Sequence, residues 1–231
     1  MSPRLVLFDI DETMIKSDGA GRRAITRALV SVFGITGDTD GVIMSGKTDP
    51  QICSEIMCNS GISADEINSK LPTVFALYPP LLKEEIERSP GYRLHDGIKE
   101  LLKALSSQAA ARLGLLTGNI EAGARLKLEP FALNDYFPIG AFGCDSADRM
   151  DLPKIARQRA ANFYKTAFGN REVVIIGDSV NDVRCAAGFG AVSIAVNTGK
   201  TTYAELEQCR PDFLFDTLSD TSSVMAAIMG G

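Results

Sequence analysis

The chain has 231 residues, which is enough for one large domain or for one domain that carries a smaller inserted one. With 45% hydrophobic and 23% charged residues, the composition is that of an ordinary globular protein with a buried core. A formal net charge of -5 without any basic run argues against nucleic acid or an anionic membrane as a partner, and no apolar run approaches the roughly 20 residues of a membrane span. Five scattered cysteines form no metal-binding pattern, and the start of the chain lacks the form of a secretory signal, so we expect a cytoplasmic protein.

The first predicted element is a β-strand, because residues 5–8 form a short apolar run. The next segment, residues 19–90, reads mainly as helix, with apolar residues at helical spacing. A second helix is expected to start at Asp49-Pro50, since proline is favoured at the first helical position. Tyr78-Pro79-Pro80 is expected to interrupt a third helix, so that residues 81–87 form a helix of their own.

After residue 90 the pattern changes to an alternation of short apolar strands and helices. The strands are expected at residues 112–116, 139–142, 173–176, 192–196 and 213–215. The helices are expected at residues 96–106, 120–129, 152–167, 179–187, 202–207 and 218–229. Such alternation is typical of a parallel sheet with right-handed crossovers. The sequence therefore predicts an α/β fold with a doubly wound parallel sheet.

The helical block interrupts this alternation after only one strand. We therefore expect it to be an all-helical cap domain, residues 17–90, inserted into a core domain formed by residues 1–16 and 91–231. Two joints, near residues 16–18 and 88–92, would connect the two parts.

Two carboxylates, Asp9 and Asp11, follow the first predicted strand. An open α/β sheet binds its ligands beyond the carboxyl ends of its strands. Two anions this close repel each other unless a cation or a proton lies between them. Because hard oxygen ligands suit Mg²⁺, the sequence predicts a divalent metal site here.

Three later predicted strands are also followed by polar or charged residues that could bind a ligand or take part in a reaction. Thr117-Gly118-Asn119 supplies a hydroxyl and a glycine turn whose backbone N–H groups can hold phosphate oxygens. Arg149 and Lys154 supply cations around the start of a helix. Asp178 and Asp182 follow another buried strand. We expect these groups to meet at one edge of the sheet.

This ordered set resembles the haloacid dehalogenase (HAD) superfamily, and the resemblance covers essentially the whole chain. Asp9-Ile10-Asp11-Glu12-Thr13 is similar to the first motif of the superfamily, Thr117 to the second, and Gly177-Asp178 with Asp182 to the fourth. The helical insertion followed by Gly46-Lys47-Thr48-Asp49 resembles the phosphoglycolate phosphatase-like branch.

The chain departs from the superfamily pattern at two places. Residue 12 is Glu where the family usually has Gly, which places an extra carboxylate beside the site. The third motif lacks its common Lys-Pro pairing, so either Arg149 or Lys154 could be its cation. Arg149 is the preferred candidate, since Lys154 would already lie inside the helix.

The resemblance implies catalytic roles for Asp9, Asp11, Thr117 and Arg149. Asp9 would attack phosphorus and form an aspartyl-phosphate, while Asp11 would protonate the leaving group and then activate water. Mg²⁺ would be held by Asp9, by the backbone carbonyl of Asp11 and by Asp178. Arg149 would neutralise charge, and Asp182 would orient Arg149 or the metal ligands.

The resemblance also implies where the substrate binds. Thr117, Gly118 and Asn119 would hold the phosphate oxygens, and Lys47 and Thr48 of the cap would contact the leaving group. A small phosphorylated metabolite is the expected partner, without nucleic acid or membrane, and the protein is expected to be a monomer or a homodimer.

The expected function is therefore a Mg²⁺-dependent phosphatase that hydrolyses a small organic phosphomonoester, with phosphoglycolate the first substrate to try. A dehalogenase of the superfamily needs neither the Asp11 acid nor a metal ligand at Asp178, and both residues are present. Two alternatives stay open: a phosphosugar mutase of the same branch, and a non-catalytic binding protein with the HAD fold.

Overall fold

A six-stranded parallel sheet with strand order β5-β4-β1-β6-β7-β8 forms the centre of the protein. The computed structural model describes residues 2–230. The strands of this sheet are β1 (Arg4–Phe8), β4 (Ala111–Leu116), β5 (Gly140–Ala141), β6 (Val173–Gly177), β7 (Val192–Val196) and β8 (Phe213–Phe215). A separate antiparallel pair joins β2 (Ile15–Lys16) to β3 (Arg93–Leu94).

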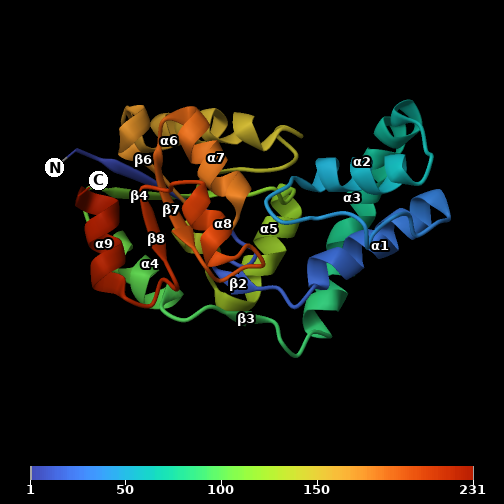
Figure 1. Cartoon of the computed structure of the whole chain (residues 1–231), viewed down its shortest axis with the longest axis horizontal. Helices are drawn as coiled ribbons and strands as arrows, with labels where there is room; N and C mark the ends of the chain where they lie inside the picture. Colours follow the sequence, from blue (N-terminus) through green and yellow to red (C-terminus); the bar gives the residue numbers. More distant parts are fainter. Residues whose placement is uncertain (1, 231) are drawn as a thin grey trace.

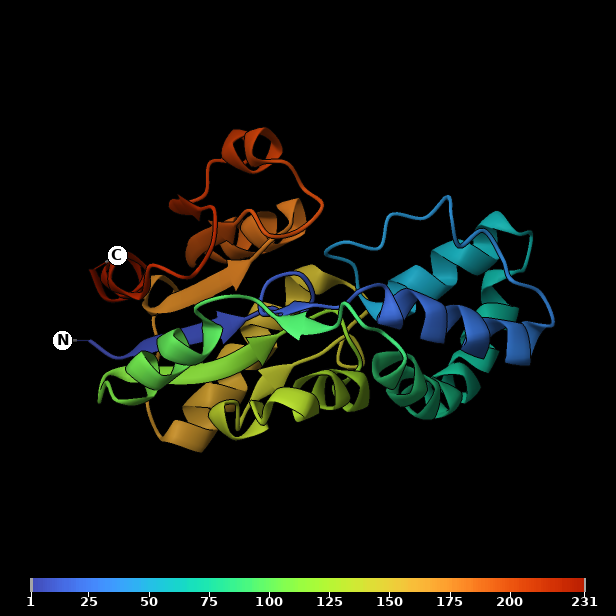
Figure 2. The ribbon, with the colours of Figure 1, turned by 90° about the horizontal axis from the view of Figure 1, so that it is seen from below.

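Helices cover both faces of the sheet, as Figures 1 and 2 show. One face packs on α4 (Ile98–Ser106), α5 (Glu121–Leu128) and α9 (Thr221–Gly230). The other face packs on α6 (Leu152–Tyr164) and α7 (Val180–Phe189), while α8 (Tyr203–Gln208) lies beside α7. Because both faces are covered, the central strands are apolar at successive positions. The predicted doubly wound α/β fold is confirmed.

Three helices form a cap at one end of the molecule: α1 (Ala20–Phe33), α2 (Asp49–Asn59) and α3 (Ala64–Glu87). They lie together to one side of the sheet in both ribbon views (Figures 1 and 2). A hydrophobic cluster of their own holds them together. The β2–β3 pair lies where the chain leaves the sheet for the cap and returns from it. Within residues 2–230, no helix is long and apolar enough to cross a membrane.

The prolines do not break α3, and the predicted interruption at residues 78–80 was wrong. The helix runs without a break from residue 64 to residue 87 and contains Pro72, Pro79 and Pro80. An internal proline costs a helix roughly 3 kcal/mol. Tyr78 and Leu82, which flank the proline pair, are both buried in the cap cluster. Because burying one large apolar side chain stabilises a fold by about 1.5–3 kcal/mol, the five that α3 buries, which also include Ile67, Val74 and Ile86, together offset the cost of the prolines.

Candidate active site

The ends of three adjacent strands bring the predicted site residues together. Asp9 follows β1, Thr117 follows β4 and Asp178 follows β6, and β1 pairs with both of the other strands. The Asp9 N–H donates to the carbonyl of Ile176 at 2.9 Å, which extends the pairing one residue past β1. Because the strands are parallel, all three side chains lie beyond the same edge of the sheet.

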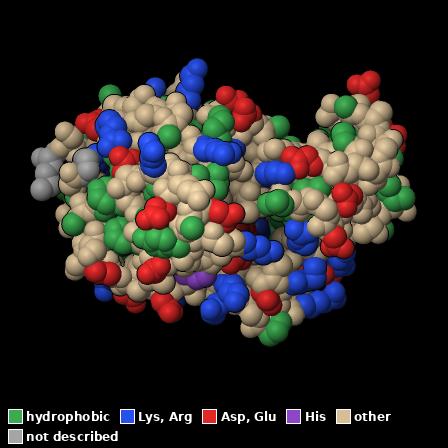
Figure 3. Space-filling model, viewed as in Figure 1, with side chains coloured by type: hydrophobic (Ala, Val, Ile, Leu, Met, Phe, Trp, Pro, Cys, Tyr) green, Lys and Arg blue, Asp and Glu red, His purple; other side chains and the backbone are tan. Residues whose placement is uncertain are grey.

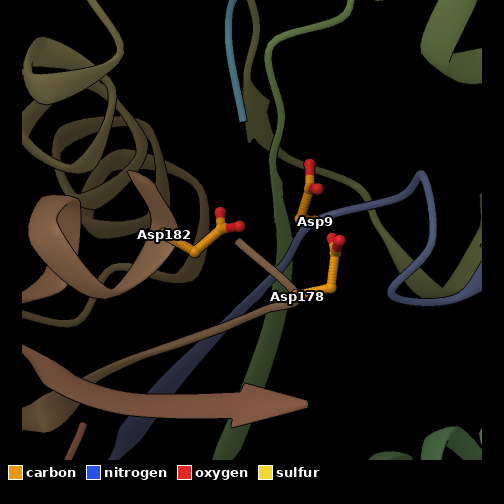
Figure 4. Close-up of side chains that lie close together, drawn as sticks. All are labelled: Asp9, Asp178 and Asp182. Carbon is orange, nitrogen blue, oxygen red and sulfur yellow. The ribbon is translucent and has the colours of Figure 1, made fainter. Parts of the chain in front are cut away.

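Asp9, Asp178 and Asp182 form a buried acidic cluster (Figure 4). One carboxylate oxygen from each of the three lies within 4.8 Å of the others. Burial raises the pKa of Asp9 to about 6, although the nearby Arg149 guanidinium opposes this shift. Burial, followed by repulsion from the other two carboxylates, also raises the pKa of Asp178 well above its usual value. A cation between these groups would stabilise their charged forms.

The hydrogen bonds show which carboxylates have oxygens free for a cation. Both oxygens of Asp182 are used, because Oδ1 accepts from Arg149 and Oδ2 accepts from the Ser179 hydroxyl and N–H. Asp9 contacts Arg149 through Oδ1, and Asp178 accepts from Thr13 through Oδ1. The donor set of Asp9 and Asp178, which consists of hard oxygens, fits a divalent ion such as Mg²⁺.

Arg149 lies within the acidic cluster, whereas Lys154 is exposed on α6. The guanidinium of Arg149 is 2.5 Å from Asp182 and 3.3 Å from Asp9. Its Nε–H is buried and has no partner among the described residues. Of the two cations proposed for the third motif, only Arg149 is placed to act on Asp9.

Arg149→Met is expected to destabilise the metal-free protein by about 3–5 kcal/mol, because it leaves two buried carboxylates without their counter-charge. Urea unfolding in EDTA measures this loss. Arg159→Met is the matched control, since Arg159 pairs with Asp145 at the surface, where an ion pair contributes about 0–1 kcal/mol. Equal losses in the two variants would show that Arg149 does not hold the cluster together.

Asp11 turns its side chain to a group that the sequence analysis missed, Lys127 on α5. The ammonium of Lys127 lies 2.8 and 2.7 Å from the two Asp11 oxygens. It also donates to Oδ1 of Asn119 at 2.6 Å, and the Asn119 amide donates to Asp11 and to the Thr117 hydroxyl. The side chains of Asp11, Thr117, Asn119 and Lys127 therefore form one network.

The spacing of residues along α5 could have indicated that Lys127 faces the core. Gly123 and Ala124 lie on the buried face of α5, and Lys127 follows the first by four residues and the second by three. Residues at these two spacings share one face of a helix. A lysine at a core-facing position is almost never fully buried unless it is paired, so its position predicts a partner.

The N-terminus of α2 attaches the cap to residues 117–120, which follow β4 and are called the second-motif loop below. The Asp49 N–H donates to the carbonyl of Gly118 at 2.7 Å, and the Asp49 carboxylate accepts from the Ile120 N–H at 2.8 Å. The Thr48 hydroxyl donates to the carbonyl of Ala147 and accepts from the Gln51 N–H. Thr48 is fully buried and its hydroxyl serves this attachment, so its expected contact with substrate stays a prediction that these bonds do not support.

Lys47 lies at the wall of the cavity, but its ammonium is paired with Glu55. Gly118 lies against the backbone of Lys47, where an added Cβ would be 2.0 Å from the Lys47 carbonyl oxygen. Residue 118 therefore has to be glycine for the cap to approach this closely. The glycine predicted for phosphate binding also sets the contact between cap and core.

Asp49→Asn is expected to stabilise the protein by about 1–3 kcal/mol at pH 7.5 and to have little effect at pH 4. Burial raises the pKa of Asp49 to about 6. The folded protein therefore keeps this proton up to about pH 6, whereas the unfolded chain loses it near pH 4, so stability falls as the pH rises through this window. Chemical denaturation at both pH values measures the difference, with Asp65→Asn, in the exposed first turn of α3, as the control. A destabilised Asp49→Asn variant at pH 7.5 would contradict this prediction.

Glu12, the residue that departs from the superfamily pattern, has a left-handed backbone with φ of 58°. Its carboxylate accepts from the N–H and the hydroxyl of Ser17, and its carbonyl accepts from Thr198. Glu12 thus fixes the turn that leads from the site into the cap.

A cavity of about 340 Å³ lies between the cap and the sheet edge. Its core side carries Asp9, Asp11, Asn119, Lys127, Arg149 and Asp178. Its cap side carries Arg22, Ile25, Val42, Lys47, Ile52 and Tyr78. Lys and Arg side chains gather where the two parts of the molecule meet (Figure 3). The volume suits a small ligand.

Known proteins with similar sequences and folds agree with this arrangement. A HAD-hydrolase-like family model matches residues 152–221. A phosphoglycolate phosphatase from Vibrio vulnificus strain YJ016 is 25% identical over 96% of both chains, and one from Agrobacterium fabrum is 27% identical over 94% of this chain and 89% of its own. A hydrolase structure from Pseudomonas syringae superimposes with a TM-score of 0.73, at 18% identity, over 98% of this chain and 99% of its own.

The parallel sheet, the acidic cluster at its edge and these similarities support a relation of the chain to the HAD superfamily. The chain is similar to phosphoglycolate phosphatases over nearly its whole length, and this similarity supports a HAD-type phosphatase as its enzyme class.

Proposed function

We propose that the protein is a Mg²⁺-dependent phosphatase that hydrolyses a small organic phosphomonoester through an aspartyl-phosphate on Asp9. The main support is the position of Asp9, which is buried between the Arg149 guanidinium and the second carboxylate, Asp178. A carboxylate can approach a phosphate dianion only where positive charge offsets their repulsion. The names of the curated relatives make phosphoglycolate the first substrate to test.

Asp9, Asp178 and the backbone carbonyl of Asp11 would hold the Mg²⁺ ion. When bound, the ion supplies two positive charges that neutralise phosphate oxygens. Arg149 supplies a further charge, and its Nε–H is a donor that neither Asp9 nor Asp182 uses. The Thr117 hydroxyl and the N–H groups of the second-motif loop would orient the remaining oxygens.

The proposed reaction has two steps that balance in protons and bonds. In the first, an Asp9 oxygen bonds to phosphorus, the bond to the leaving oxygen breaks, and the Asp11 carboxyl gives its proton to that oxygen to form the alcohol. In the second, Asp11 takes a proton from water as the water oxygen bonds to phosphorus. The bond to Asp9 then breaks, which releases phosphate and restores both side chains.

We further propose that residues 17–90 act as a cap domain over a core of residues 1–16 and 91–231. The cap helices have their own hydrophobic cluster, and their residues form one wall of the cavity. A cap in this position would exclude water from the first step and select the leaving group. Lys47 is the cap residue that we propose to contact it.

A panel of small phosphomonoesters, assayed for phosphate release with Mg²⁺ and with EDTA, tests this proposal. We expect release that requires the metal, with the highest kcat/KM for a small alkyl phosphate. Turnover in EDTA would contradict the metal-dependent mechanism. Phosphoryl transfer between sugar phosphates with little net release would favour the mutase, and no reaction with any compound would favour a binding protein.

A further inference from the structure

Lys127 is a buried cation in the cavity wall that the proposed reaction does not use. Its side chain is 4% exposed, whereas the Asp11 side chain that it contacts is 31% exposed. Both residues line the cavity, but the ammonium is shielded from solvent while the Asp11 carboxylate is the more exposed partner of the pair. A cation placed in this way can act on a substrate through Asp11.

The geometry of the contact restricts the Asp11 side chain. An ammonium has three donor hydrogens, and its three acceptors are the two Asp11 oxygens and Oδ1 of Asn119. The Asn119 amide N–H also donates a hydrogen bond to Oδ2 of Asp11, at 2.7 Å. Charge-assisted hydrogen bonds of this kind are roughly twice as strong as neutral ones. The carboxylate is thus held by two neighbours, both on the core side of the cavity.

The cap leaves space for this arrangement. A Cβ added to Gly21 on α1 would lie 3.2 Å from the Lys127 ammonium and 3.5 Å from the Tyr78 hydroxyl. The glycine therefore lets α1 pass close over the ammonium. Lys127 is enclosed between α1 and the loop after β4, where the low exposure strengthens its attraction to Asp11.

We propose that Lys127 is a positioning residue, which holds Asp11 where it can pass a proton to the oxygen of the leaving group. This inference rests on the proposed function, in which Asp11 is the acid and base. It separates the roles of the two buried cations: Arg149 acts at Asp9 and the phosphoryl group, and Lys127 acts at Asp11 and the leaving group.

The dependence of the rate on the leaving group tests this role. An alkoxide needs a proton as it departs, whereas 4-nitrophenolate is a stable anion that leaves without one. Lys127→Met is therefore expected to lower kcat for the best alkyl phosphate of the panel by about 10- to 100-fold, and kcat for 4-nitrophenyl phosphate by less than about threefold. Lys127→Arg, which keeps the charge, is expected to recover part of the loss. Lys103→Met, on the exposed side of α4, is the control.

A double-mutant comparison tests whether Lys127 acts through Asp11. In an Asp11→Asn background, adding Lys127→Met is expected to change kcat for the alkyl phosphate by less than about threefold, because the group that it positions is already lost. Equal losses on both substrates, a full further loss in the Asp11→Asn background, or a rise in KM alone would each overturn the proposal. Thermal unfolding of every variant identifies losses that come from unfolding.

Crystal structures of the wild-type protein and of Lys127→Met provide a readout without turnover. A displaced or disordered Asp11 side chain in the variant supports the proposal, and an unmoved one overturns it. If the wild-type protein hydrolyses neither substrate, the proposed function fails, and these structures still decide whether Lys127 positions Asp11.

Discussion

Asp9→Asn is expected to lower phosphate release by at least about 10³-fold, because an amide oxygen is a poor nucleophile and a missing nucleophile is not replaced by its neighbours. The loss should appear in kcat for alkyl and aryl substrates alike, since both must transfer their phosphoryl group to residue 9. Initial rates with saturating substrate and Mg²⁺ measure it.

The same variant should remain folded. Burial raises the pKa of Asp9 to about 6, so the ionised carboxylate lowers the stability of the metal-free protein at neutral pH. We expect metal-free Asp9→Asn to have a Tm no lower than that of the wild-type protein. Asp135→Asn, at an exposed position, is the activity control. Substantial activity in folded Asp9→Asn would refute covalent catalysis at this residue.

Mg²⁺ is expected to raise the Tm by about 5–10 °C at a concentration a hundredfold above its Kd, where binding to the folded state adds about 2.7 kcal/mol. The physical reason is the acidic cluster, in which Asp9 and Asp178 have raised pKa values without a metal. The effect should weaken as the pH falls below about 6, because protons then compete with the ion for Asp9. Thermal scans with Mg²⁺ and with EDTA measure the difference.

Asp178→Asn should remove most of this Mg²⁺-dependent increase while raising the Tm measured in EDTA. The variant lacks one buried charge and keeps a side chain of nearly the same shape. A Tm that still rises with Mg²⁺ in Asp178→Asn would place the ion elsewhere. Asp212→Asn, beside Arg171 and Ser193 at the amino end of β7, serves as the control.

Much of the fold could be predicted because its signals are local. The buried strands β1, β6 and β7 are short apolar runs bounded by polar residues, and these patterns locate a strand in any parallel sheet. The predicted interruption of α3 was wrong because it rested on another local signal, the tendency of proline to end a helix. Whether a helix continues through Pro79 and Pro80 depends on what α3 packs against, which comes from distant parts of the chain.

The residues of the candidate site likewise divide into those that local sequence signals place and those that depend on contacts with distant parts of the chain. Asp9, Thr117 and Asp178 each follow a strand, so topology alone brings them to one edge. Lys127 lies on the last turn of α5, 116 residues from Asp11, and nothing in the neighbouring residues specifies this pairing. The attachment of Asp49 to residues 118 and 120 is likewise a contact between cap and core, which depends on how the cap is oriented.

The second-motif loop has two neighbours at once: its Thr117 and Asn119 side chains line the cavity, and its backbone at Gly118 and Ile120 binds the first turn of α2. A cap that swings away must first break these bonds, and one that returns must form them again. Under the proposed function, entry of substrate and release of product would therefore be coupled to the peptide segment that would orient the phosphoryl group. The pace of the enzyme should then reflect the unlatching of this segment as well as the chemistry.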